Sequence, residues 1–271
     1  MKQKLELSTI KRKPLKFLVQ LSRSILKQRQ QLGDDSPKFV DMLQLMIDAE
    51  SKSERGQGDM RTDEEIIANI LVVPMAGYET TASLLTFAAY CLVMHPEVQD
   101  KLRSEIEEAV RGDGGEISYE TVMDLKYLDA VVSKTLRRYP PVIQVERTVA
   151  EDYEFKDLGC KIAKGCKIRI PIYAIHHQEE FYADPFNFDP ERFMPKNKDK
   201  LVPYTHLPFP SGPRNCIGAR FALLAAKTTL SSILIKYTLS RSHSATEPLD
   251  MRNVTKTMKA EKVIVRYTAR T

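Results

Sequence analysis

Hydrophobic residues recur at intervals of three and four along most of the chain, and this spacing predicts a series of helices. A short helix is expected to begin near Ser36, after which apolar residues continue the pattern to about Glu50. The stretch 66–94 is apolar nearly all round, which is typical of a helix buried in a core. Thr62 and Glu65 precede it with the spacing of a capping box, so we expect the helix to start there.

Two features interrupt this first part of the chain. Residues 51–61, SKSERGQGDMR, combine charged residues with glycine, and we interpret them as a charged surface linker. Pro74 lies inside the long helix, where a proline costs about 3 kcal/mol and removes a backbone hydrogen bond. The helix is therefore expected to kink or open about one turn before Gly77.

The middle of the chain predicts two more helices. One begins at His95-Pro96 and ends near Val110, where the turn sequence RGDGG stops it. The other carries apolar residues at helical spacing from Leu125 to Leu136 and ends at the double proline 140–141.

The second half of the chain has a different pattern. Short segments rich in Val and Ile between residues 142 and 173 predict a small antiparallel sheet. Residues 183–209 are rich in proline and phenylalanine and contain too many helix and strand breakers for regular structure. Residues 217–237 have the pattern of a helix, and residues 262–268 have that of a strand. Helices first, then strands, indicate a mostly α (α+β) fold rather than alternating β and α elements.

Composition excludes several classes of protein without identifying a function. The chain has 271 residues, of which 42% are hydrophobic and 28% charged, so collagen-like and disordered classes are excluded. Its 41 basic and 36 acidic residues leave a net charge of +5, which is too small to indicate a nucleic-acid partner. Four cysteines without a C-x-x-C pair favour a reducing compartment. No signal peptide and no transmembrane segment are predicted.

The most specific chemistry lies in the loop Phe209-Pro-Ser-Gly212-Pro-Arg214-Asn-Cys216-Ile-Gly218. The loop delivers Cys216 to the start of a predicted helix, where the helix dipole and the nearby Arg214 both favour a thiolate. A thiolate is a soft ligand for a metal ion, and the two glycines let a bulky planar group approach the backbone. Taken alone, Cys216 is better described as a buried cysteine in a turn, and only the other features of the loop reverse this preference.

The whole loop resembles the signature F-x-x-G-x-R-x-C-x-G of the cytochrome P-450 family, the haem-thiolate monooxygenases. By this resemblance Cys216 is the axial ligand of the iron of haem b, and Arg214 faces a haem propionate. Phe209 and Gly218 are the other signature positions that we expect to contact the cofactor. The resemblance implies a P-450-like helical fold with a small antiparallel sheet, in which thiolate ligation favours O–O cleavage.

A second segment, Ala76-Gly77-Tyr78-Glu79-Thr80-Thr81, is similar to the family motif A-G-x-[DE]-T-T on the helix that crosses the distal haem face. The resemblance implies that Thr80 holds oxygen and water, that Glu79 conducts protons and that Ala76 lies against the haem. An acid and a hydroxyl group side by side relay protons through water. The alternative is that these are ordinary polar residues of a long helix.

Two further segments match the family pattern. Glu146-Arg147 after the double proline resembles the strand whose arginine reaches a propionate, so Arg147 is a candidate haem contact. The segment 189–193, DPERF, matches the P-E-R-F element. An ordinary proline turn with solvated charges explains either segment equally well.

One position departs from the family. The family has E-x-x-R on the helix before the double proline, whereas this chain has Lys134-Thr-Leu-Arg137. Residues three apart share a helix face, so Lys134, Arg137 and Arg192 are expected to place three cations where two cations and an anion belong. Lys134 swinging outward or Glu191 compensating are the alternatives. We expect impaired haem retention, because a buried ion pair that loses one partner costs about 3–5 kcal/mol.

The length of the chain is a second departure, since the family's chains are nearly twice as long. Residues 1–271 are therefore interpreted as a single partial domain, the C-terminal part of a P-450-like domain with the N-terminal half missing. The resemblance implies a monooxygenase that inserts one oxygen atom from O2 into a lipophilic substrate. The alternatives are a truncated, inactive relative that binds haem weakly or not at all, and a helical interaction module without cofactor.

The resemblance also implies partners and a location. Electrons would come from an NADPH-dependent cytochrome reductase, and the full-length form would associate with the cytosolic face of the endoplasmic reticulum membrane. The basic residues expected either to dock the reductase or to form a solvated helix face are Lys101, Arg103, Arg220 and Lys227. The adjacent His176 and His177 lack neighbouring ligands at metal spacing, so a structural role is favoured for them.

Overall fold

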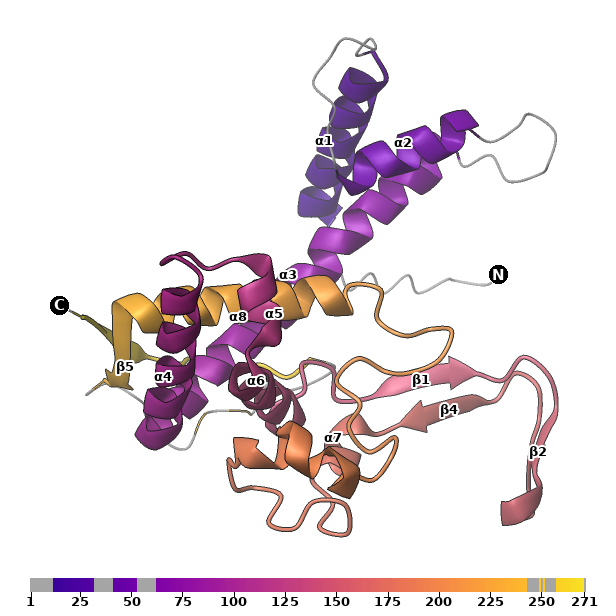
Figure 1. Ribbon diagram of the computed structural model, residues 1–271. Coiled ribbons are helices and arrows are strands. Elements are labelled where there is room, and N and C mark those ends of the chain that lie inside the picture. The colour runs from indigo at the N-terminus through magenta and orange to yellow at the C-terminus, as the bar shows by residue number, and fades with distance from the viewer. Residues whose placement is uncertain are drawn as a thin grey trace. The chain divides into compact units, whose positions relative to one another are not determined.

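The computed structural model describes residues 12–31, 41–52, 62–242, 249, 251 and 257–270. These residues belong to two compact units, one within Met1–Tyr78 and the other within Glu79–Thr271. Figure 1 shows the elements of both units, which are considered one at a time below.

The first unit contains α1 (Arg12–Gln30), α2 (Met42–Lys52) and the start of α3 (Asp63–Met94). The apolar side chains that these helices bury against one another are Leu26, Leu43, Ile66, Ile67 and Leu71. The helical periodicity that extends to about Glu50 includes α1, although it does not predict where this helix starts and ends. The expected helix start near Ser36 lies outside the described residues, as do residues 53–61 of the predicted linker, whose first two residues end α2.

The helix α3 starts as predicted and is longer than its apolar pattern alone. The Thr62 N–H donates to Glu65 Oε2 at 2.8 Å and the Glu65 N–H donates to Thr62 Oγ1 at 3.3 Å, so the capping box is confirmed. The helix continues without a break through Pro74 to Met94, so the expected opening before Gly77 is wrong, and the kink expected as its alternative stays a prediction. The backbone stays helical here although Pro74 removes one hydrogen bond and Val72, Val73 and Gly77 are weak helix formers.

One helix of the described part of the chain, α3, is long and apolar enough to cross a membrane by length and composition. Its C-terminal half is a core element of the second unit, where Leu84, Phe87 and Leu92 are fully buried. Core helices of this kind have the same composition as a membrane span.

The second unit is built around α3, α4 (Pro96–Gly112), α6 (Lys126–Arg138) and α8 (Ala219–Lys236). The buried side chains by which these helices form one core include Leu92, Leu102, Ile106, Leu128, Val131, Leu230 and Leu234. The helices predicted at 96–110, 125–136 and 217–237 are confirmed. The short α5 (Tyr119–Asp124), capped by Ser118, precedes α6, and its six residues are too few to show a helical pattern.

The strands form three separate antiparallel pairs rather than one sheet. The first pair joins β1 (Val145–Thr148) to β4 (Lys167–Ile170), with Val145 opposite Ile170. The second joins β2 (Tyr153–Phe155) to β3 (Cys160–Ile162), and the third joins β5 (Tyr237–Arg241) to β6 (Val265–Ala269). Between α7 (Ile172–His176) and α8 the chain is irregular apart from two 3₁₀ helices, η2 (Pro190–Phe193) and η3 (Pro195–Lys200). The fold is mostly α with small antiparallel sheets, as predicted.

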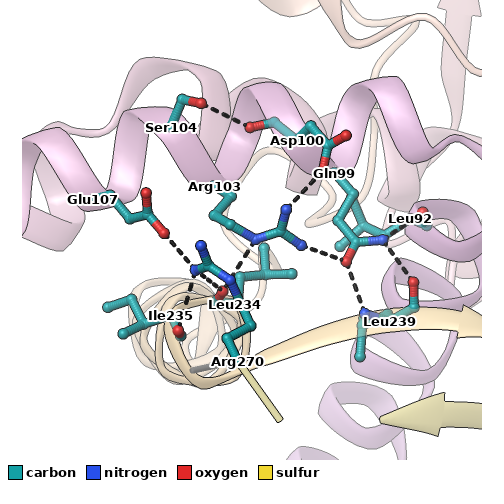
Figure 2. Close-up of polar contacts among 10 residues, drawn as sticks. All are labelled: Leu92, Gln99, Asp100, Arg103, Ser104, Glu107, Leu234, Ile235, Leu239 and Arg270. Carbon is teal, nitrogen blue, oxygen red and sulfur yellow. Dashed lines mark hydrogen bonds and ion pairs between the residues drawn. The ribbon is translucent and has the colours of Figure 1, made fainter. Parts of the chain in front are cut away.

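A buried amide connects α4 to the start of the C-terminal hairpin (Figure 2). The side chain of Gln99 is 2% exposed and donates to the carbonyls of Leu92 and Leu239 at 3.1 and 3.0 Å. Its Oε1 accepts from the Leu239 N–H and from Arg103 Nη2, both at 2.8 Å. Gln99 therefore satisfies polar backbone groups at two places that are 147 residues apart in the chain, Leu92 and Leu239.

Replacing Gln99 by leucine is expected to lower the free energy of unfolding by about 2 kcal/mol, because it leaves buried backbone groups unsatisfied without opening a cavity. Chemical denaturation followed by circular dichroism measures the change. Ser104→Ala is the matched control, since that hydroxyl group bonds only to the Asp100 carbonyl on the exposed side of the same helix (Figure 2). Equal stability of the two variants would contradict a stabilising role for Gln99.

Candidate functional site

The cysteine loop is held by backbone hydrogen bonds and leaves its sulfur accessible. Gly212 has φ +94°, a conformation that side chains disfavour, and its carbonyl accepts from the Asn215 N–H at 3.0 Å. The resulting tight turn places Cys216 just before Gly218, the N-cap residue of α8. Cys216 is exposed. Exposure is compatible with a cysteine that binds a ligand, and it contradicts the alternative of a buried cysteine in a turn.

Space and apolar surface surround the loop. A Cβ atom added to Gly212 or Gly218 would meet no atom within 4 Å. Ile217 is fully exposed and Phe221 is 75% exposed, whereas Phe209 packs against the core of the second unit. The surface beside Cys216 is therefore both open and apolar, which suits a large flat apolar ligand.

Two arginines meet at this loop. Arg147 on β1 donates through Nη2 to the carbonyl of Arg214 at 3.2 Å and through Nη1 to the carbonyl of Glu146 at 3.0 Å. The side chain of Glu146 points to the neighbouring strand, where it pairs with Lys167 and Arg169 at 3.0 and 3.1 Å. These cations hold the pKa of Glu146 below its usual range. Among the described residues, neither arginine pairs with a carboxylate, so their charge can offset that of an anionic group near Cys216.

The polar residues of α3 have partners on the C-terminal segment. Glu79 Oε1 accepts from Lys259 Nζ at 3.4 Å, and one turn further along, Ser83 Oγ donates to the carbonyl of Met258 at 2.7 Å. Thr80 lies beside Glu79 and is half-buried, and Ala76 lies in the same helix, within the first unit. Sequence spacing carries no signal for Ser83 or Lys259, because their partners lie 175 and 180 residues away in the chain.

The predicted cluster of three cations is present, and its lysine is buried. Lys134 has no exposed surface, and its Nζ has no hydrogen-bond partner among the described residues. Arg137, three residues on, is also fully buried and donates to the carbonyls of His176 and Pro185, while Arg192 on η2 donates to the Ala183 carbonyl at 2.6 Å. Burial and the two guanidinium groups lower the pKa of Lys134 to about 7.

Both alternatives for Lys134 are wrong. The side chain stays inside, and Glu191 binds elsewhere: it pairs with Lys101 on α4 and with Lys196 at 3.3 Å. Instead of a carboxylate, Arg137 and Arg192 both contact the electron-rich face of Tyr182. Their guanidinium carbons lie 4.8 and 5.7 Å from the ring centroid. An aromatic ring offsets only a small part of the charge that a carboxylate would neutralise.

His176 has a structural role. Its Nε2 accepts from the Leu207 N–H at 2.8 Å, so the proton sits on Nδ1, which donates to the Arg137 carbonyl at 3.1 Å. Burial lowers the pKa of His176 to about 3, and the ring is neutral at physiological pH. Within the described part of the chain, no three His, Cys, Asp or Glu side chains form a metal cluster.

The proposed basic docking face does not form as a unit. Lys227 is buried and pairs with Asp129 at 2.8 Å, which joins α8 to α6. Arg103 is buried and bonds to Gln99, Asp100 and the Leu234 carbonyl (Figure 2). Of the four residues considered, Lys101 and Arg220 remain at the surface.

The donor set fits a haem group. A flat apolar iron complex with anionic edges requires a sulfur ligand, room at the backbone, apolar contacts and cations. The cysteine loop offers the exposed Cys216, two glycines with open space around them, apolar side chains beside the sulfur and two arginines near it.

Comparison with known proteins agrees with this chemistry. The family model "Cytochrome P450" matches residues 7–265. Cytochrome P450 3A7 of Homo sapiens is 39% identical over 248 residues, which are 92% of this chain and 48% of that protein. Cytochrome P450 3A13 of Mus musculus is 42% identical over 78% of this chain, and cytochrome P450 9e2 of Blattella germanica 36% over 87%. The chain spans about half the length of these relatives. With a match across nearly its whole length, the chain belongs to the cytochrome P450 family.

Proposed function

We propose that this chain binds haem b through Cys216 and is the catalytic C-terminal portion of a monooxygenase that inserts one oxygen atom from O2 into a lipophilic substrate. The observation that carries the proposal is the exposed Cys216 on a glycine-bounded loop at the start of α8. At the level of the family, the activity is that of a haem-thiolate monooxygenase.

Each residue of the site has a proposed task. The Cys216 thiolate ligates the iron, Phe209 and Gly218 pack beside the cofactor, and Arg214 and Arg147 offset the charge of its carboxylates. Haem, when bound, supplies the activation of oxygen that no side chain provides.

On α3, the Thr80 hydroxyl group is proposed to hold water, and Glu79 to hand protons to it from solvent. The ion pair of Glu79 with Lys259 supports this assignment, because it keeps the carboxylate at the surface, where it exchanges protons with bulk water. Ala76, one turn earlier, is proposed to present a small side chain toward the cofactor.

The partners and the location are proposed together. Electrons come from an NADPH-dependent cytochrome reductase, and the full-length form associates with the cytosolic face of the endoplasmic reticulum membrane. No nucleic-acid partner is proposed, since the net charge is only +5.

The test is to reconstitute the purified chain with haemin, reduce it and add carbon monoxide. We expect the strongly red-shifted Soret band of a thiolate opposite carbon monoxide, and we expect Cys216→Ser to abolish it. Cys160→Ser and Cys166→Ser are matched controls, because both thiols are exposed and neither belongs to the cysteine loop. Cys160 is the first residue of β3, and Cys166 lies directly before β4. A band typical of imidazole ligation in the unaltered chain would overturn the assignment; turnover with reductase and NADPH then tests the enzyme.

A second candidate is a relative that holds haem weakly and does not turn over substrate. The buried, unpaired Lys134 favours it, because the three-cation cluster weakens the part of the fold that supports the irregular segment before the cysteine loop. Haem binding without turnover would select this candidate.

A further inference from the structure

A cavity of about 660 Å³ lies in the second unit at the C-terminal end of α6. This volume is within the range of about 300–1,000 Å³ that small-molecule sites have. Its lining is mainly aromatic and aliphatic, and includes Arg138, Tyr139, Gln144, Tyr173, Phe186 and Met258. None of these residues belongs to the cysteine loop, and none is among the proposed haem contacts.

Arg138 is the one charged residue among the described residues that line this cavity. Its guanidinium carbon lies 4.8 Å from the ring centroid of Phe186 and 5.1 Å from that of Tyr139. The two rings hold the guanidinium group in place at the wall of the cavity.

The group that Arg138 does contact carries no negative charge. Arg138 Nη1 lies 3.3 Å from Nε2 of His177, whose Nδ1 donates to the Tyr173 carbonyl at 2.8 Å. Burial lowers the pKa of His177 to about 4, so the ring is neutral and its Nε2 accepts from Arg138. Within the described part of the chain, no carboxylate pairs with Arg138 and none lines the cavity.

An apolar cavity with one fixed, unneutralised guanidinium group selects a particular kind of ligand. A planar carboxylate accepts two parallel hydrogen bonds from arginine, and an apolar body covers the tyrosine, phenylalanine and methionine side chains. We propose that this cavity binds a small lipophilic carboxylate, with Arg138 as the anchor for its anionic group. Gln144 supplies an amide at the same wall for a second polar contact.

The test compares naphthalene-2-carboxylate with naphthalene-2-carboxamide, which has the same shape without the charge, by isothermal titration calorimetry on the full chain. We expect the carboxylate to bind about tenfold more tightly, because hydrogen bonds between ionised partners are roughly twice as strong as neutral ones. Arg138→Gln should remove that preference, and Phe186→Leu should weaken both ligands by a similar factor.

Arg266→Gln on β6 is the matched control, since Arg266 is exposed and outside the cavity lining, and it should keep the preference. Equal affinities of the two ligands for the unaltered chain would overturn the proposal, and so would a preference that survives in Arg138→Gln. Because the first comparison uses the unaltered chain, the proposal remains testable even if a variant does not fold. No binding of either compound would also overturn it.

Discussion

Replacing Lys134 by methionine is expected to raise the free energy of unfolding by about 3 kcal/mol at pH 7, because it removes an unpaired buried amine between two guanidinium groups. Methionine fills a similar volume without a charge, so the packing of α6 is retained. Chemical denaturation followed by circular dichroism measures the gain. Lys126→Met on the exposed side of α6 is the matched control, and we expect it to change stability by less than about 0.5 kcal/mol.

The gain should depend on pH in a defined direction. The pKa of Lys134 falls from 10.5 to about 7 in the folded chain, so between these values the unfolded chain binds more protons than the folded chain. The free energy of unfolding of the unaltered chain therefore rises with pH across this window. Below pH 7 both states carry the proton, so Lys134 contributes no further pH dependence there. In Lys134→Met the rise should disappear. The same pH dependence in both proteins would contradict a buried, deprotonated lysine.

Replacing Lys134 by glutamate tests its connection with the cofactor. The substitution places a carboxylate beside Arg137 and Arg192, where the family pattern has one, and we expect a higher haem occupancy of the purified chain. Occupancy is measured as the ratio of Soret to protein absorbance after reconstitution with haemin. Unchanged occupancy would mean that position 134 affects only the stability of the fold.

Replacing Asp129 by alanine is the second substitution with a large expected effect. Lys227, whose side chain is 3% exposed, has Asp129 as its ion-pair partner among the described residues. Asp129 itself is 54% exposed, so solvent screens part of the interaction. Its removal still leaves the buried Lys227 amine without this partner, and we expect the free energy of unfolding to fall by about 2 kcal/mol. The double variant Asp129→Ala/Lys227→Met should recover most of this loss, because it removes both charges together.

The control for this substitution is Asp124→Ala. That carboxylate is 88% exposed and pairs with Lys126 at 3.5 Å, so its loss should cost less than about 0.5 kcal/mol. A similar loss of stability in both variants, or no recovery in the double variant, would contradict a cost of leaving Lys227 buried without Asp129.

Periodicity predicts the parts of the fold in which one segment carries its own signal. The long helices α3, α4, α6 and α8 each have an apolar stripe or an apolar body, and their residues identify them without reference to the rest of the chain. The two ribbons β1–β4 and β2–β3 were expected as one sheet, because alternation shows that strands exist but not which strands pair.

The residues of the candidate site also differ in whether a local sequence pattern identifies them. The cysteine loop is a contiguous motif, so Cys216, Arg214 and Gly218 are recognisable in the sequence. The burial of Lys227 and Arg103 is not recognisable in the sequence, because their partners Asp129 and the Leu234 carbonyl lie far away along the chain. A charge pattern alone describes such residues as surface cations.

The exposed Ile217 and Phe221 beside Cys216 have a consequence for handling the protein in solution. Large apolar side chains that are exposed to water favour contact between copies of the chain. Self-association should therefore increase with protein concentration and with added sulfate, and decrease with mild detergent or when a flat apolar ligand covers these side chains. The colloidal behaviour of the chain thus becomes a direct readout of whether the surface beside its cysteine is covered.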